Sequence, residues 1–288
     1  MIDDEQRQGM LAVAACALLW STGGIFIKLV NWHPLAIAGA RSFIAAAVIL
    51  AVLKRPKITF SLPQIFAAVF HAGTMMLFVS ATRSTTAANA IILQFTAPLY
   101  VAVLGWGMLG EKPAIHHWAA LGAAAAGMVL FFQDELAPGF LAGNLMAAGS
   151  GVTFAMFSIF MRRQKDGSPL ESMLLSNVLV ALIGLPFYGR GPAPDAVGWV
   201  SVACLGLFQT GLALLLFTRG IRRITALSAM LIAVLEPLLN PLWVLIFTGE
   251  KPGLWALVGG SVILVSVTAS SVLSVGASDR SGLRFSRK

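Results

Sequence analysis

Charged residues are scarce in this 288-residue chain, where Asp, Glu, Lys and Arg together make up 11% of the sequence. A soluble domain carries roughly 25%. Hydrophobic residues make up 58%, and the few charges fall in short clusters between apolar runs of about 20 residues, the length that a bilayer span requires. The scarcity of charge therefore excludes a soluble globular protein and indicates an integral membrane protein surrounded by the lipid bilayer.

Cysteine and histidine are also rare, with two and four copies in the chain. Cys16 and Cys204 both lie inside apolar runs, so we expect no structural disulfide. His116 and His117 lie at a membrane edge, and the sequence offers no second cluster of ligands, so we expect no metal ion and no cofactor. The sequence has no His-Glu-X-X-His, no phosphate-binding Gly-rich loop and no Cys-X-X-Cys, which argues against the enzyme classes that use them.

An internal repeat is the most informative feature that is present. Residues 77–113 align without a gap with residues 216–252, at an offset of 139, and both stretches end in Gly-Glu-Lys-Pro. The identical pairs include the interior prolines Pro98 and Pro237. Two apolar stretches match by chance at Ala and Leu, but rarely at an interior proline and a polar tetrapeptide together. The sequence therefore consists of two related halves.

The apolar runs predict an all-α integral membrane protein with ten transmembrane helices, five in each half. The expected spans are 9–30, 34–53, 62–82, 86–108, 114–133, 138–161, 169–188, 195–218, 224–247 and 253–275. They divide the chain into a cytoplasmic N-terminus at 1–8, a first five-helix repeat at 9–133, a second at 138–275, and a disordered cytoplasmic tail at 276–288.

The distribution of basic residues predicts the orientation of these spans. Of the 20 Lys and Arg, 15 lie on the face that holds both termini, 4 lie on the other face, and Arg41 lies inside a span. Because cytoplasmic loops are enriched in Lys and Arg, both termini are expected in the cytoplasm. We interpret the basic excess as this topology signal, with no nucleic-acid partner. An odd number of spans in each half makes the second half cross the membrane in the opposite sense, as in many secondary transporters.

Taken together, ten spans, two five-span halves, an interior proline in a late span of each half and the Gly-Glu-Lys-Pro turns resemble the drug/metabolite transporter superfamily, EamA type. The resemblance implies a secondary transporter of small metabolites in the bacterial cytoplasmic (inner) membrane. It is greatest to bacterial exporters of amino acids, aromatic ones included, although no short motif selects a substrate. The sequence leaves open the coupling ion and whether the protein is a monomer or a homodimer.

Polar and aromatic residues near the middle of spans are the candidates for a central cavity. Six of the seven tryptophans lie near span ends as interface anchors, whereas Trp20 lies near the middle of its span and either packs in the core or lines the cavity. His71 shares a helix face with Thr74 and Phe78. The 139-residue offset pairs His71 with Thr210, and Gln209 lies next to Thr210 in the sequence. The full candidate set is Trp20, His71, Thr74, Phe78, Gln94, Tyr100, Phe154, Phe157, Gln209, Phe217 and Glu236.

Three further features have alternative interpretations. Glu236 has no counterpart in the first half; it is a protonated structural residue, a proton-coupling residue or the counter-charge of a substrate ammonium. Arg41, a candidate charge site, either extends outward to the membrane surface or pairs with Glu236 or with a substrate carboxylate. Pro98 and Pro237 interrupt their helices and act as paired hinges or as static kinks.

A mostly apolar pocket with few polar groups suits a small zwitterion with an apolar side chain. Its ammonium can lie against an aromatic ring, and its carboxylate can accept hydrogen bonds from His71 or Gln209. We therefore expect export of neutral amino acids, aromatic and branched aliphatic, by alternating access. One alternative is exchange of nucleotide sugars or sugar phosphates, although only Arg41 and Lys28 could supply cations. An alternative of another class is a rhomboid-like intramembrane protease using Ser150 with His71.

Overall fold

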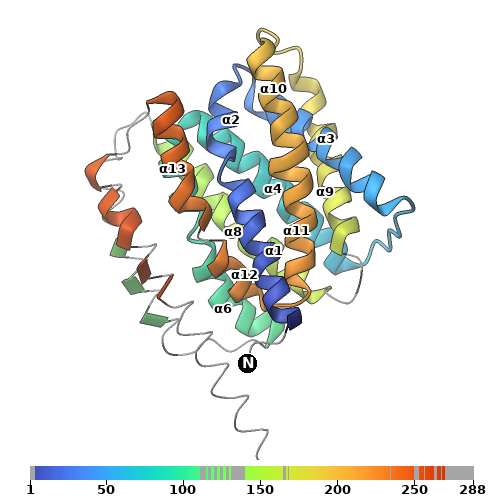
Figure 1. Ribbon diagram of the computed structural model, residues 1–288, viewed down its shortest axis with the longest axis vertical. Coiled ribbons are helices and arrows are strands. Elements are labelled where there is room, and N and C mark those ends of the chain that lie inside the picture. The colour runs from blue at the N-terminus through green and yellow to red at the C-terminus, as the bar shows by residue number, and fades with distance from the viewer. Residues whose placement is uncertain are drawn as a thin grey trace, which may run out of the picture.

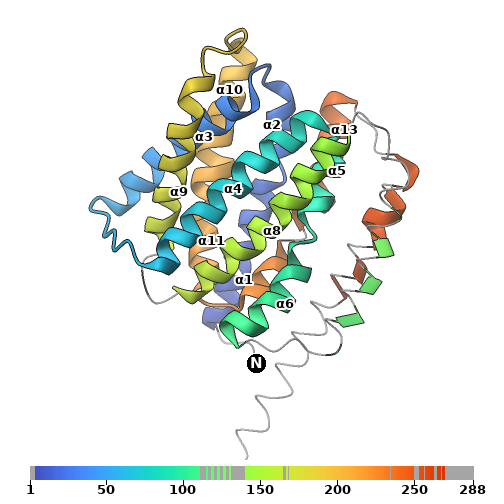
Figure 2. The same cartoon turned by 180° about the vertical axis from the view of Figure 1, so that it is seen from behind.

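The structure is a computed structural model that describes residues 4–110, 140–164, 167, 169–233 and 235–249, together with parts of 115–130 and 253–269. Within these ranges the chain is helical and contains no β-strand. The helices lie side by side in a bundle, seen from opposite sides in Figures 1 and 2. Parts of the expected spans 114–133 and 253–275, and the tail at 276–288, lie outside the described residues.

The helices of the first half follow the expected spans closely. They are α1 (Asp4–Trp20), α2 (Gly23–Leu29), α3 (Pro34–Leu53), α4 (Leu62–Ser84), α5 (Ala87–Gln94) and α6 (Ala97–Leu109). Those of the second half are α8 (Leu141–Arg163), α9 (Pro169–Gly184), the 3-10 turn η1 (Leu185–Phe187), α10 (Ala196–Cys204), the π-helix η2 (Leu205–Leu212), α11 (Ala213–Ile221), α12 (Ala226–Ile232) and α13 (Leu235–Thr248).

Seven helical stretches in the described part of the chain are long and apolar enough to cross a membrane. They are Asp4–Leu29, Pro34–Leu53, Leu62–Ser84, Asn89–Leu109, Leu141–Arg163, Pro169–Phe187 and Ala196–Ile221. The expected ninth span at 224–247 contains the two shorter helices α12 and α13 and is not one of these seven stretches. The protein is therefore a multi-pass membrane protein, and its count of ten spans stays a prediction.

Local sequence signals set several helix ends. The hydroxyl of Thr86 accepts a hydrogen bond from the amide of Asn89 at 3.1 Å, and the carboxylate of Asp195 accepts one from the amide of Gly198 at 2.7 Å. These caps satisfy first-turn amides that have no helical partner. At the other end of a helix, Gly110 ends α6 with a φ of 70°, a left-handed conformation that costs glycine little.

Helix pairing places the core between distant parts of the chain. α4 packs on α8, α3 on α9, and α1 on α11. Between α3 and α9 the approach is close, because a methyl group added at Gly39 would come within 2.8 Å of the Cα of Gly184. Small residues allow such contacts between membrane helices, where packing replaces the hydrophobic effect as the driving force.

Several helices are broken or irregular in the interior of the molecule. α1 and α2 are separated at Ser21 and Thr22, and α5 and α6 at Phe95 and Thr96. The hydroxyls of Ser21, Thr22 and Thr96 each donate to a backbone carbonyl three residues earlier, at 2.7–2.8 Å. The carbonyls of Leu19 and Leu93 also accept the backbone amides of Thr22 and Thr96, so these hydroxyls add to the backbone hydrogen bonds that close the last turn before each break. Pro98 lies in the first turn of α6, and Pro237 is the third residue of α13, so each predicted proline bend is a complete helix break shortly before the proline.

The break recurs in both halves of the repeat. α5 and α12 begin at Ala87 and Ala226, 139 residues apart, and each is followed by a second short helix. In Figures 1 and 2, α5 lies toward the upper end and α6 toward the lower end, whereas α12 is low and α13 is high. In these two views the pairs α5–α6 and α12–α13 therefore run in opposite directions.

Trp32 differs from the expected behaviour of a membrane-interface anchor. Its side chain is only 7% exposed, and its indole N–H donates to the carbonyl of Tyr188 at 3.2 Å. A buried indole needs such a partner, so Trp32 joins the loop after α2 to the residue that follows η1. Of the other span-end tryptophans, Trp243 is half-buried, and Trp106, Trp118, Trp199 and Trp255 are exposed.

Candidate functional site

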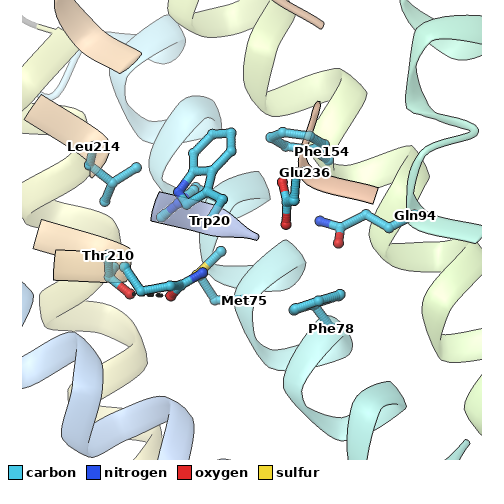
Figure 3. A pocket seen from close by; sticks show the side chains of 10 residues that line it. Trp20, Met75, Phe78, Gln94, Phe154, Thr210, Leu214 and Glu236 are labelled. Atoms are coloured by element: carbon cyan, nitrogen blue, oxygen red, sulfur yellow. Dashed lines mark hydrogen bonds between the residues drawn. The ribbon is translucent and has the colours of Figure 1, made fainter. Parts of the chain in front are cut away.

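A central cavity lies where the broken helices meet (Figure 3). The cavity is narrow, because the space between its side chains that a water-sized molecule could occupy is only about 20 Å³. The lining residues are Trp20, His71, Met75, Phe78, Gln94, Phe154, Gln209, Thr210, Leu214 and Glu236. Seven of these ten were candidates from the sequence, and their role in binding a substrate stays a prediction.

The helix discontinuities position much of the cavity wall. Trp20 is the last residue of α1, Gln94 is the last residue of α5, and Glu236 is the second residue of α13. Gln209 and Thr210 lie in the π-helix η2. Broken membrane helices expose backbone groups, which are tolerated where they line a cavity, and π-helical segments are frequent at functional sites. The arrangement therefore concentrates polar atoms at one place inside an apolar bundle.

The candidate set left out Met75, Thr210 and Leu214, although the repeat had already paired Thr210 with His71. A signal was present, because the 139-residue offset pairs His71 with Thr210 and Met75 with Leu214. His71 and Met75 are four residues apart, as are Thr210 and Leu214, so each pair follows one side of its helix. Applying the repeat to apolar residues as well would have added Met75 and Leu214.

Thr74 and Tyr100 were candidates that do not line the cavity. The Thr74 hydroxyl is hydrogen-bonded to the carbonyl of Phe70 at 2.8 Å and to the hydroxyl of Thr153 at 2.9 Å. It therefore joins α4 to α8, and the rotation of α4 turns Met75 toward the cavity. Tyr100 is half-buried and packs against the hydrophobic core from α6.

Phe157 and Phe217 form a second aromatic layer behind the cavity wall. Both are fully buried, and their rings stack at a centroid distance of 5.5 Å. Phe217 also contacts Trp20 at 5.3 Å, and Phe157 contacts Phe154 at 6.0 Å. Aromatic pairs at these distances add stability beyond burial, so the two residues support Trp20 and Phe154 without facing the cavity themselves.

His71 is held by a hydrogen bond to a neighbouring helix. Its Nδ1 lies 2.6 Å from the hydroxyl of Ser176 on α9, and its ring packs on Phe157 at 4.7 Å. The other ring nitrogen, Nε2, is buried without a partner. Among the described residues, no group of three or more His, Cys, Asp and Glu comes together as a metal site would require.

The Ser150–His71 pair of the protease alternative does not form. Ser150 is buried in α8, and its hydroxyl donates to the carbonyl of Ala147 at 2.7 Å. His71 instead pairs with Ser176. A serine nucleophile must lie within hydrogen-bond reach of its base, so this arrangement does not support Ser150 as a nucleophile.

Arg41 points into the protein and does not extend toward the membrane surface. Its side chain is fully buried. Nη1 donates to Oε1 of Gln209 at 3.2 Å, and Nη2 donates to Sδ of Met75 at 2.9 Å. Arg41 therefore lies behind the cavity wall, in contact with two residues that line it.

Glu236 brings an acidic group to the cavity. Its side chain is 6% exposed and points toward the amide of Gln94 in Figure 3. It interacts electrostatically with Arg41, although the two described residues form no direct ion pair. One turn later, Asn240 is fully buried with both side-chain amide atoms unpartnered. The cavity thus contains a carboxyl group near several unsatisfied polar atoms.

Known proteins resemble this chain over almost its whole length. The chain is 28% identical over 268 residues to an uncharacterised transporter of Archaeoglobus fulgidus, which covers 91% of this chain and 95% of that protein. It is 24% identical over 222 residues to the threonine/homoserine exporter RhtA of Escherichia coli, 74% of each chain. A solved crystal structure with 22% identity aligns with a TM-score of 0.71 over 93% of this chain and 98% of its own, which shows a shared fold.

The family comparison agrees with the resemblance seen in the sequence. The sequence profile of the EamA-like transporter family matches residues 7–133 and again residues 141–272. These two matches span most of the chain and show that it belongs to the EamA-like transporter family of the drug/metabolite transporter superfamily.

Proposed function

We propose that this transporter exports neutral amino acids, aromatic and branched aliphatic ones included, by alternating access around the central cavity. The cavity wall carries the proposal. Trp20, Phe78 and Phe154 supply apolar surface, and a few polar groups lie at the helix breaks. Such a wall accommodates an apolar side chain while its polar atoms orient a small charged head group.

Similarity to relatives supports the same substrate class. One relative is a threonine/homoserine exporter at 24% identity, and the EamA-like family is a transporter family, which favours transport over catalysis. We propose no catalytic residue.

Architecture and orientation belong to the same proposal. We propose ten transmembrane helices in two inverted repeats, at 9–133 and 138–275, in the bacterial inner membrane with both termini in the cytoplasm. The opposite directions of α5–α6 and α12–α13 support the inverted repeat. The strong bias of Lys and Arg to one face supports the orientation.

Transport by purified protein in proteoliposomes tests the substrate class. Radiolabelled phenylalanine and leucine should be carried, whereas glutamate and glucose phosphate should be carried poorly, because desolvating an additional anion in this cavity is uncompensated. Carriage of glucose phosphate or a UDP-sugar without phenylalanine or leucine would contradict the proposal and favour the exchanger alternative.

A pair of tryptophan variants makes the test specific to the cavity. Trp20→Ala should reduce phenylalanine transport about tenfold, since an aromatic contact contributes on the order of 1–2 kcal/mol. Trp106→Ala is the matched control, because Trp106 is half exposed on the surface of α6. If both variants reduced phenylalanine transport equally, the loss could not be attributed to the cavity.

A further inference from the structure

Arg41 controls the hydrogen bonding of one cavity residue, Gln209. The Oε1 atom of Gln209 accepts from Nη1 of Arg41 at 3.2 Å and from the hydroxyl of Thr210 at 3.1 Å. The second of these bonds is the dashed line beside Thr210 in Figure 3. An amide oxygen has two acceptor sites, so both are occupied. The guanidinium can only donate, and it therefore determines which end of the amide is oxygen.

The amide nitrogen of Gln209 is the end that remains for a ligand. Nε2 lies over Gly23 at the start of α2, where an added methyl group would come within 2.9 Å of it. It has no hydrogen-bond partner among the described residues, and Gln209 lines the cavity. Two N–H donors with a guanidinium cation behind them suit an anionic oxygen, because charge-assisted hydrogen bonds are the strong ones.

Glu236 contributes an acidic group to the cavity from another helix. Its carboxyl group lines the cavity from α13, whereas Gln209 lines it from η2. Both elements pack against α1, and Trp20 at the end of α1 lies between Thr210 and Glu236 in Figure 3. The cavity therefore has hydrogen-bond donors backed by a cation at one side and a carboxyl group at the other.

We propose that Arg41 is a positioning residue that orients the Gln209 amide, and that Gln209 and Glu236 bind the carboxylate and the ammonium of the substrate, respectively. This inference rests on the proposed function and specifies how its substrate is recognised. A zwitterion satisfies both sides of the cavity. An amine that lacks the carboxylate offers the Gln209 donors no charged acceptor, and an N-acylated amino acid lacks the ammonium that matches Glu236.

The test compares two ligands that differ only in the carboxylate. Phenylalanine and phenylalanine amide compete with radiolabelled phenylalanine in proteoliposomes, and the ratio of their inhibitory concentrations measures recognition of the carboxylate. Wild type should prefer phenylalanine. Arg41→Gln and Gln209→Ala should each lower this preference about tenfold, the effect of one hydrogen bond to a charged group. Combining the two changes should lower it no further.

Two more variants act on the same amide without removing the buried arginine. Gly23→Ala displaces only the flexible end of Gln209, so the protein should still fold. The preference for phenylalanine over phenylalanine amide should fall. Gln209→Glu places a carboxylate beside Arg41, so phenylalanine should be lost while phenylalanine amide is still bound. Ser42→Ala is the matched control on α3, because Ser42 is buried next to Arg41 in sequence and does not line the cavity. The Ser42→Ala variant should prefer phenylalanine to phenylalanine amide as strongly as wild type does.

Each outcome decides the inference. If Arg41→Gln weakens both ligands equally, its role is structural and the inference is wrong. If Arg41→Gln does not fold, an unchanged preference in Gly23→Ala and Gln209→Glu overturns it instead. If wild type carries phenylalanine but does not prefer it to phenylalanine amide, only the inference is wrong. If wild type carries no amino acid, the proposed function is wrong as well.

Discussion

Several buried polar atoms near the cavity have no hydrogen-bond partner in the part of the protein that the structure describes. They include Nε2 of His71, Oε1 of Gln94 and both side-chain amide atoms of Asn240. An unpaired buried polar group costs about 1–3 kcal/mol. Polar ligands or water in the cavity would supply the missing partners to His71 and Gln94, which line it. The position of these atoms therefore fits a binding site, where unpaired polar groups lower the stability of the empty protein but can bind a ligand.

Gly24 provides a prediction for one residue contact. A methyl group added there would overlap Oδ1 of Asn240 and come within 3.0 Å of its Cγ. We expect Gly24→Ala to lower the free energy of unfolding by about 1–3 kcal/mol, the usual cost of overpacking. The measurement is the melting temperature in detergent.

Two additional variants identify the cause of that loss. Gly24→Ala combined with Asn240→Ala should recover stability, because the colliding side chain is gone. Gly107→Ala is the control, since a methyl group added at Gly107 meets no atom within 4 Å. A similar loss in the control, or no recovery in the double variant, would rule out the collision.

The broken helices are the elements that build the site. In a continuous helix, the ring of Pro98 would clash with the carbonyl four residues earlier, which belongs to Gln94, a cavity residue. The residue before a proline also avoids the helical conformation. Proline thereby separates α5 from α6 and leaves Gln94 at a helix end. Pro237 has the equivalent place after α12.

Replacing Pro98 and Pro237 by Ala should make both breaks less favourable relative to a continuous helix. A helical proline costs about 3 kcal/mol relative to Ala, so the double variant should fold normally but turn over several-fold more slowly. The measurement is initial transport rate in proteoliposomes at equal protein content. Pro34→Ala is the control, because Pro34 begins α3 at a span end. If the double variant transports as fast as wild type, the two prolines are static kinks and not hinges.

For the molecule as a whole, the inverted repeat predicts that its two Gly-Glu-Lys-Pro turns face opposite sides of the membrane. Both turns lie partly outside the described residues. On a background with Cys16 and Cys204 replaced by Ala, a membrane-impermeant maleimide applied outside cells should label Lys251→Cys and not Glu111→Cys. Permeabilised cells should label both. Labelling of both turns in intact cells would be incompatible with the inverted repeat.

The sequence by itself determined the class of protein, its family and most of its helix bounds. Apolar runs have to span the bilayer, which is why α3 occupies 34–53 as predicted. Internal similarity identified the repeat and hence the transporter family. Trp20, His71, Gln94, Gln209 and Glu236 were recognised as cavity candidates because polar and amphipathic side chains in mid-membrane are costly unless they face a polar interior.

Only the tertiary structure decided which side of each helix faces the cavity. Lipid and protein core are equally apolar, so membrane helices lack the amphipathic pattern that would reveal their rotation. The Thr74–Thr153 hydrogen bond fixes α4 with Met75 toward the cavity, and stacking of Phe157 on Phe217 places both behind the wall. The inward direction of Arg41 likewise depends on a contact with Gln209, 168 residues away in sequence. Such long-range contacts form only when the helices assemble.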